Sequence, residues 1–166
     1  MSERPDLGRL RPLTPRLSIG PAPAPAPREP GRVRFRLCLI TDGQGDARRL
    51  LDILGAALPA GPPGALAVQL RERTLPGAAL YALAEQLRAL TAACGAALLI
   101  NDRLDVALAV GADGVHLPTH GLPVGAARRA VAAVGAPLLL SAAYHSLPEA
   151  QITMTANADL ITFGPI

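Results

Sequence analysis

Polar side chains at alternate positions around one short apolar run could bind an anion. The run Leu66–Leu70 contains Gln69, and Arg71, Glu72 and Arg73 follow it. At the two-residue period of a strand, Gln69, Arg71 and Arg73 share one face, while leucine and valine occupy the other. Guanidinium groups donate paired hydrogen bonds that match phosphate oxygens. The pattern predicts a phosphate-binding face, although a strand that runs into a solvated charged loop would show the same spacing.

A second polar pair, Asn101 and Asp102, follows the apolar run at 97–100. Either side chain could cap the short helix that is predicted after it. Asp102 could also bind Mg²⁺, which takes oxygen ligands and commonly bridges to substrate phosphates. The two roles are compatible. One acid beside a basic cluster would suffice to bind Mg²⁺ if the phosphates of a substrate supplied the other ligands.

Two histidines are candidates for acid–base chemistry. His116 lies in the run at 114–117, and His145 follows the run at 137–140. Imidazole changes its protonation near neutral pH, so two histidines at strand ends favour proton transfer more than one would. A packed or hydrogen-bonded structural role is the alternative for each. We interpret His120 as a loop residue.

The elements that must position these residues alternate along the chain. Apolar runs at 37–41, 66–70, 97–100, 114–117, 137–140 and 159–163 predict six strands. Segments of helical period separate them, most clearly where leucines recur at 80, 83, 87 and 90. The alternation predicts an α/β fold, with a parallel sheet whose carboxyl-terminal edge carries the candidate residues. Periodicity leaves open a doubly wound sheet or part of an eight-stranded barrel.

Composition narrows the possible classes of protein. The 166 residues have room for one domain, and with 2% aromatic residues its core must consist mainly of aliphatic side chains. No apolar run reaches the roughly 18 residues that a membrane span needs, and the first thirty residues lack a secretory stretch. We therefore expect a cytoplasmic protein without a membrane partner. Cys38 and Cys94 are expected to be reduced, packed thiols.

Residues 1–36 differ in composition from the rest of the chain. They contain eight arginines against three acids, a net charge of +5, and eight prolines. Proline fixes φ and removes hydrogen-bond donors, so this stretch predicts a disordered or semi-rigid extension. Residues 37–166 carry eight basic and ten acidic residues, a net charge of −2. Because the basic excess lies in the extension and no nucleic-acid-binding motif occurs, no nucleic-acid partner is expected.

In this order, the candidate residues resemble the thiamine phosphate synthase/TenI family. The matching segments are Cys38–Asp42, Val68–Arg73, Leu99–Leu108, Gly111–Leu117, and Ala158-Asp159 with Phe163–Ile166. The resemblance implies a TIM-type (β/α)₈ barrel that serves thiamine biosynthesis. Six of its eight βα units are expected within residues 37–166, so this barrel domain would be incomplete. Its open edges would promote association, and a homo-oligomer is one hypothesis.

Synthases of this family join hydroxymethylpyrimidine diphosphate to a thiazole phosphate and release pyrophosphate. The resemblance implies that these two small phosphorylated molecules are the partners and that Mg²⁺ is the cofactor, bound by Asp102. It also implies a phosphate contact at Gly164. The implied diphosphate-binding residues are Gln69, Arg71, Arg73 and Asn101.

The chain departs from the family pattern at three positions. Arg73 stands where the family usually has lysine, and Ala143 replaces a serine. Gly121 stands where synthases have a second Mg²⁺-binding aspartate. TenI-like members need no metal and isomerise a thiazole carboxylate phosphate, and in that case His145 would be the acid–base residue. A non-catalytic fragment or pseudoenzyme is the third alternative.

Overall fold

Six parallel strands form one sheet in the computed structural model, which describes residues 33–44, 46–146 and 157–163. All six predicted strands are confirmed within these residues. The described residues also contain four α-helices and one 3₁₀ helix, η1. The strands are β1 (Leu37–Ile40), β2 (Leu66–Leu70), β3 (Ala97–Asn101), β4 (Gly114–Leu117), β5 (Leu139–Tyr144) and β6 (Leu160–Phe163). The helices are α1 (Ala47–Ala57), η1 (Leu58–Ala60), α2 (Gly77–Ala93), α3 (Leu104–Ala109) and α4 (Val124–Ala133).

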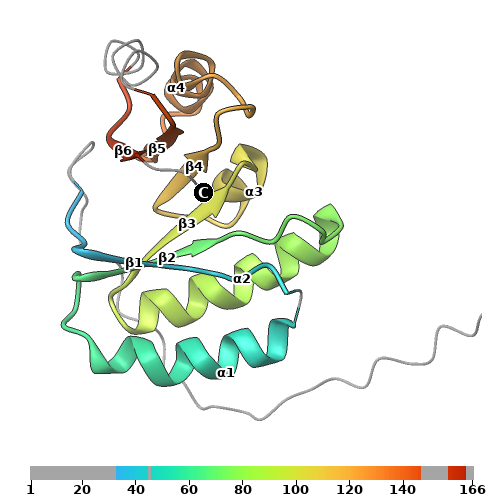
Figure 1. Cartoon of the computed structure of the whole chain (residues 1–166), viewed down its shortest axis with the longest axis vertical. Helices are drawn as coiled ribbons and strands as arrows, with labels where there is room; N and C mark the ends of the chain where they lie inside the picture. The colour runs from blue at the N-terminus through green and yellow to red at the C-terminus, as the bar shows by residue number, and fades with distance from the viewer. Residues whose placement is uncertain (1–32, 45, 147–156, 164–166) are drawn as a thin grey trace, which may run out of the picture.

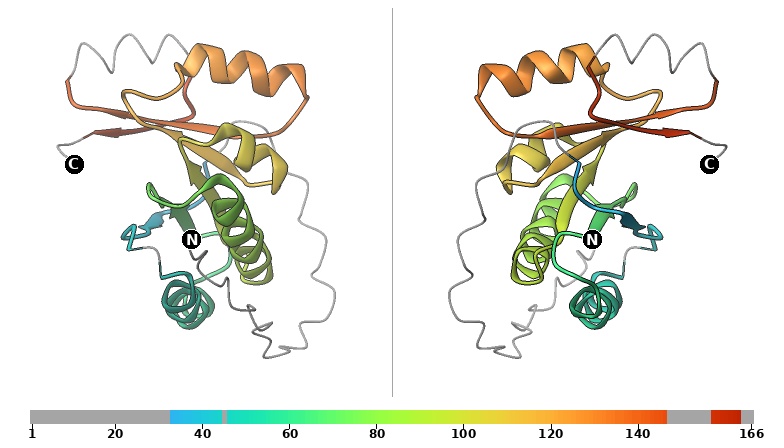
Figure 2. Two further views of the ribbon diagram at one scale, coloured as in Figure 1. Left: turned by 90° about the vertical axis from the view of Figure 1, so that its right-hand side faces the viewer. Right: turned by 90° about the vertical axis from the view of Figure 1, so that its left-hand side faces the viewer.

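The order of the strands distinguishes the two architectures that periodicity left open. Neighbouring strands in the sheet follow one another in the chain from β1 to β6, and every pair is parallel. In a doubly wound sheet the order of the strands across the sheet would instead reverse after the first strands. Since parallel crossovers share one hand, a sequential order places all the helices on one face. The helices surround the outside of a curled sheet, so the described fold is a TIM-like half-barrel (Figures 1 and 2).

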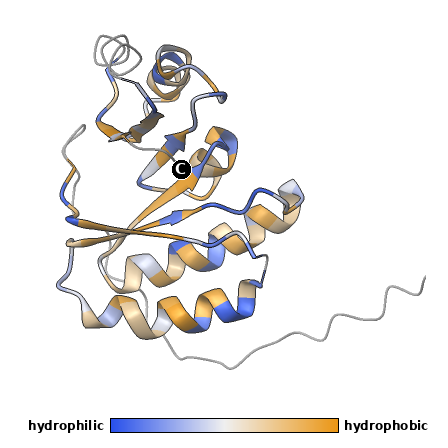
Figure 3. Cartoon of the chain, viewed as in Figure 1, coloured by the Kyte–Doolittle hydropathy of each residue, from blue (hydrophilic) through white to orange (hydrophobic). Residues whose placement is uncertain are grey.

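The apolar core lies between the helices and the outer face of the sheet. Val68 and Ile100 are fully buried there, as is Leu87 of α2. Each such side chain contributes about 1.5–3 kcal/mol to folding. The strands are mostly apolar, whereas α1 and α2 carry both polar and apolar residues (Figure 3). This packing fixes which residues of each strand face inward.

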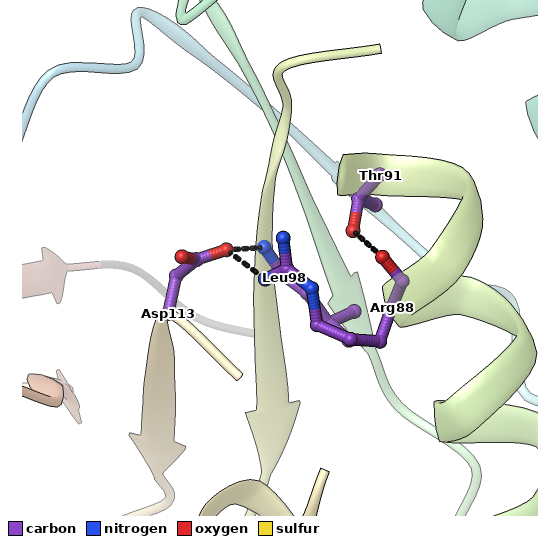
Figure 4. A network of polar contacts seen from close by, with 4 residues as sticks. All are labelled: Arg88, Thr91, Leu98 and Asp113. Atoms are coloured by element: carbon purple, nitrogen blue, oxygen red, sulfur yellow. Dashed lines mark hydrogen bonds and ion pairs between the residues drawn. The ribbon is translucent and has the colours of Figure 1, made fainter. Parts of the chain in front are cut away.

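Two aspartates, Asp113 buried and Asp159 partly buried, fasten the amino-terminal edge of the sheet at equivalent places. Asp113, just before β4, accepts hydrogen bonds through Oδ2 from the Leu98 amide at 2.6 Å and from Arg88 at 2.6 Å (Figure 4). Asp159, just before β6, likewise accepts from the Leu140 amide at 2.8 Å and from Arg128 at 2.7 Å. In each case the aspartate joins its own strand to the preceding strand and to the helix before that strand. The edge opposite the candidate residues is thus held by charge-assisted hydrogen bonds.

The fifth strand differs in position from its prediction. It was expected at 137–140 but extends from Leu139 to Tyr144. Pro137 has no amide hydrogen for a ladder, and the Leu138 amide donates to the Ala136 carbonyl instead. The small residues Ser141, Ala142 and Ala143 have low strand propensity, yet they are buried in the sheet. Tertiary packing therefore extended the strand beyond its apolar run.

Other local features of the described residues concern the helices and the cysteines. Asp46 caps α1 by accepting a hydrogen bond from the Arg49 amide at 2.9 Å. Cys38 and Cys94 are free thiols. No helix in the described part of the chain is long and apolar enough to cross a membrane.

Candidate functional site

A row of polar side chains from four neighbouring strands lies on the inner face of the half-barrel. Asn101 of β3, His116 of β4 and Ser141 of β5 are register partners, so their side chains lie at the same level of the sheet. Gln69 of β2 lies one level lower, and its Nε2 donates to Oδ1 of Asn101 at 3.2 Å. The sequence predicted Gln69, Asn101 and His116 at this edge, and the structure brings them together.

His116 and Ser141 form a buried pair within this row. The exposed fractions are 5% for His116 and 1% for Ser141, and His116 Nδ1 lies 2.9 Å from Ser141 Oγ. Burial lowers the pKa of His116, and the positive charge of Arg71 lowers it further. The imidazole is therefore neutral at physiological pH. Ser141 was not predicted from the sequence, although the two-residue period of a strand, counted from the inward-facing Leu139, places Ser141 on the inner face.

Arg71 joins the row from the loop that follows β2. It is half-buried, and its charge acts on the His116 imidazole. Its backbone amide donates to Thr41 Oγ1 at 2.9 Å, and the same hydroxyl donates to Glu72 Oε1 at 2.9 Å. Thr41 and Glu72 are both buried, and neither was predicted as part of the site. A guanidinium whose charge reaches a neutral imidazole, in a row that also contains two amide side chains, can bind an anion.

Gln69, Arg71 and Arg73 were predicted to share one face, but their side chains become more exposed along the chain. Gln69 is buried, Arg71 is half-buried and Arg73 is exposed. Because β2 ends at Leu70, strand alternation no longer determines the direction of side chains beyond it. The prediction that Arg73 shares the face of Gln69 and Arg71 is therefore not supported by the strand itself.

Asp102 has an unusual backbone conformation at the end of β3. Its φ is +66°, in the left-handed region, and its amide donates to the His116 carbonyl at 2.7 Å. The prediction that Asn101 or Asp102 caps the next helix is wrong: the N-cap of α3 is Arg103, without a side-chain cap. The amides of Arg103 and Leu104 donate to the main-chain carbonyls of Asn101 and Asp102 instead. Asp102 remains exposed and available to a ligand.

The residues near Asp102 fit Mg²⁺ only if a substrate brings most of its oxygen ligands. A Cβ added to Gly121 would lie 2.6 Å from Asp102 Oδ1, so the loop after β4 contacts this carboxylate. The described residues contain no group of three histidine, cysteine, aspartate or glutamate side chains that could hold a metal. Mg²⁺ is commonly held by one or two carboxylates together with substrate phosphates. Asp102 fits this arrangement as a single carboxylate ligand.

The remaining predicted residues lie at the margin of the site or outside the described residues. His145 is exposed and directly follows β5. Thr119, in the loop after β4, donates from Oγ1 to the Ala143 carbonyl at 3.2 Å, which ties that loop to β5. Gly164 lies outside the described residues. The structure therefore brings together Gln69, Asn101, His116 and Arg71, whereas Asp102, Arg73 and His145 are exposed and follow the carboxyl ends of their strands.

Comparisons with known proteins converge on one family. A family model described as thiamine monophosphate synthase matches residues 37–166. A Geobacter sulfurreducens protein, provisionally named a thiamine-phosphate synthase, is 45% identical over 136 residues, covering 81% of this chain and 61% of its own. A Methanoculleus marisnigri thiamine-phosphate synthase is 40% identical over 134 residues, covering 79% and 60%.

A solved structure is similar to this chain both in fold and in sequence. The thiamine phosphate pyrophosphorylase of Pyrococcus furiosus superimposes with a TM-score of 0.69 at 30% identity, covering 81% of this chain and 62% of that chain. The chain thus spans about three fifths of the length of each of these relatives.

Proposed function

The chain belongs to the thiamine monophosphate synthase family, and we propose that its inner-face polar row binds the diphosphate of the pyrimidine substrate in thiamine phosphate synthesis. The observation that carries this proposal is the convergence of Arg71, Asn101 and His116 at the carboxyl-terminal edge, where barrels bind their ligands. We further propose that the six strands are the first six units of an eight-unit barrel. In this view residues 37–166 belong to the barrel, and residues 1–36 are a separate extension of a cytoplasmic protein.

The proposed reaction joins the methylene carbon of the pyrimidine substrate to the thiazole nitrogen, and the bond from that carbon to the diphosphate breaks to release pyrophosphate. Negative charge accumulates on the diphosphate as its bond to carbon breaks, so cationic groups and hydrogen-bond donors fixed around it lower the barrier. Arg71 supplies the charge. Asn101 supplies a donor, because its Oδ1 already accepts from Gln69 and its amide hydrogens are left for a ligand. Gln69 orients Asn101 in this scheme.

His116 and Asp102 have different roles in this proposal. His116, whose lowered pKa keeps it neutral, supplies an uncharged ring beside Arg71 that can exchange a proton. Asp102 would hold Mg²⁺, which when bound neutralises part of the phosphate charge. Arg73 would extend the positive field at the exposed margin.

Pyrophosphate binding tests the proposed site directly. Isothermal titration calorimetry with pyrophosphate and Mg²⁺ should give an affinity at least tenfold weaker for Arg71→Ala than for wild type, because a charge-assisted contact is lost. Arg129→Ala removes an exposed arginine on α4 and is the matched control for net charge, with unchanged affinity expected. Equal affinities for the two variants would refute the proposal. Formation of thiamine phosphate from the two substrates would then test the whole reaction.

A metal-independent tautomerase is the second candidate function. The single carboxylate beside Gly121, where synthases have a further acid, favours this alternative. His145, exposed at the end of β5, would then transfer the proton. Isomerisation of a thiazole carboxylate phosphate that is abolished by His145→Ala and unaffected by a chelator would select this function over the synthase.

A further inference from the structure

Thr41, just after β1, makes three hydrogen bonds to residues 69–72 at the end of β2. Its amide donates to the Gln69 carbonyl at 3.0 Å. Its Oγ1 accepts from the Arg71 amide at 2.9 Å and donates to Glu72 Oε1 at 2.9 Å. With 5% of its surface exposed, Thr41 is buried, as are Gln69 and Glu72, whereas Arg71 is half-buried.

The hydroxyl of Thr41 has a defined direction. It carries a single hydrogen, and because the Arg71 amide can only donate, that hydrogen is committed to Glu72. Glu72 is also buried, with 8% exposed, so this bond orients a carboxylate as well as the hydroxyl. The two bonds therefore fix each other in a low-dielectric surrounding.

The loop after β1 adds a steric contact to the same stretch. Gly43 has φ of +72°, and a Cβ at this position would lie 3.2 Å from the Arg71 carbonyl oxygen. A residue with a side chain would be strained there. Both backbone polar groups of Arg71 thus face the segment Thr41–Gly43, although β2 itself ends at Leu70.

We propose that Thr41 is a positioning residue for the anion site, acting through Arg71. By fixing the backbone from which the guanidinium extends, the hydroxyl removes conformational freedom that an arginine in a free loop would lose on binding. A binding group held in place before the ligand arrives gives tighter binding than a mobile one. The inference rests on the proposed function, because it takes Arg71 to be the anion-binding group.

Matched substitutions separate the hydroxyl from the shape of the side chain. Thr41→Val keeps the branched shape and removes the hydroxyl, whereas Thr41→Ser keeps the hydroxyl. Calorimetry with inorganic pyrophosphate should give an affinity about tenfold weaker for Thr41→Val and within about twofold of wild type for Thr41→Ser. The salt dependence of binding should also decrease in Thr41→Val, as in Arg71→Ala, because a charged contact is partly lost.

Parallel measurements distinguish the possible failures. Pyrophosphate binding unchanged in Arg71→Ala would refute the proposed function itself. Binding that is lost in Arg71→Ala but equal to wild type in a folded Thr41→Val would overturn only the role of Thr41. A merely structural role would lower the unfolding midpoint of Thr41→Val and leave its affinity unchanged below that temperature.

If Thr41→Val does not fold, the same substitution can be tested in a Glu72→Leu variant. Glu72→Leu removes the buried carboxylate that would otherwise lose the hydrogen bond from Thr41, and replacing both partners of a hydrogen bond by apolar groups is usually tolerated better than replacing one. Within this background Thr41→Val should again weaken pyrophosphate binding about tenfold relative to Glu72→Leu alone. Equal affinities for the single and double variants would overturn the proposal.

Discussion

The ion pair between Arg88 and Asp113 should contribute strongly to the stability of the half-barrel. Asp113 is 3% exposed, and its Oδ2 accepts from both the Arg88 guanidinium and the Leu98 amide at 2.6 Å. Asp113→Ala leaves both donors without this acceptor. Removing one partner of a buried ion pair costs about 3–5 kcal/mol. This is a large part of the 5–15 kcal/mol by which small domains are stable.

Two other aspartates in the chain provide a graded comparison. In the pair between Arg128 and Asp159, the side chains are 32% and 13% exposed, so Asp159→Ala should cost less, about 1–3 kcal/mol. In the pair between Arg103 and Asp105, they are 42% and 65% exposed, and Asp105→Ala should have no measurable effect. Solvent screening explains the order.

Urea unfolding at neutral pH, followed by circular dichroism, measures the three changes on one scale. The free energy of unfolding should fall most for Asp113→Ala, less for Asp159→Ala and least for Asp105→Ala, with similar denaturant slopes. Equal losses for the aspartates at 105 and 113 would refute the reasoning from burial. A change in slope would show that the denatured or native state had changed compactness, and that variant would need a thermal measurement.

Further predictions concern the candidate site. Arg71→Ala should raise the pKa of His116 by removing a nearby positive charge, and an NMR titration of the imidazole that shows no change would place the guanidinium elsewhere. Because burial lowers this pKa below its usual 6.5, the unfolded chain takes up a proton that the folded chain excludes. Stability should therefore fall as the pH drops through about 6.5, and His116→Gln should flatten this dependence in urea titrations. Gly121→Ala should displace the Asp102 carboxylate and weaken Mg²⁺-dependent pyrophosphate binding, so an unaltered Mg²⁺ response would contradict Asp102 as a ligand.

The sequence predicted the elements well because each carries a local signal. The leucines of α2 recur at helical spacing and all lie within Gly77–Ala93, and five of the six apolar runs became strands at nearly the expected positions. The exception, β5, includes Ser141 and Ala142, which are strand residues only because neighbouring strands and α4 enclose them. A short-range pattern cannot report that enclosure.

The candidate site was predicted in part. Gln69 and Asn101 follow from polar residues at strand ends, and their contact at 3.2 Å agrees with that reasoning. Thr41 and Ser141 were not identified, since a lone hydroxyl at the end of an apolar run does not reveal the residue to which it will bond. Each acquired its role from a partner at least 25 residues away in the chain.

By itself, the sequence determined that Arg71, Asn101 and Asp102 lie where a parallel sheet binds ligands, because residue type and strand period are local properties. Only the tertiary structure decided that the sheet curls in sequential order and that Thr41 fastens the Arg71 backbone. It also decided that Asp102 adopts a left-handed conformation against Gly121 instead of capping α3. Strand order, burial and side-chain contacts depend on packing between distant segments, so they arise only when the chain folds.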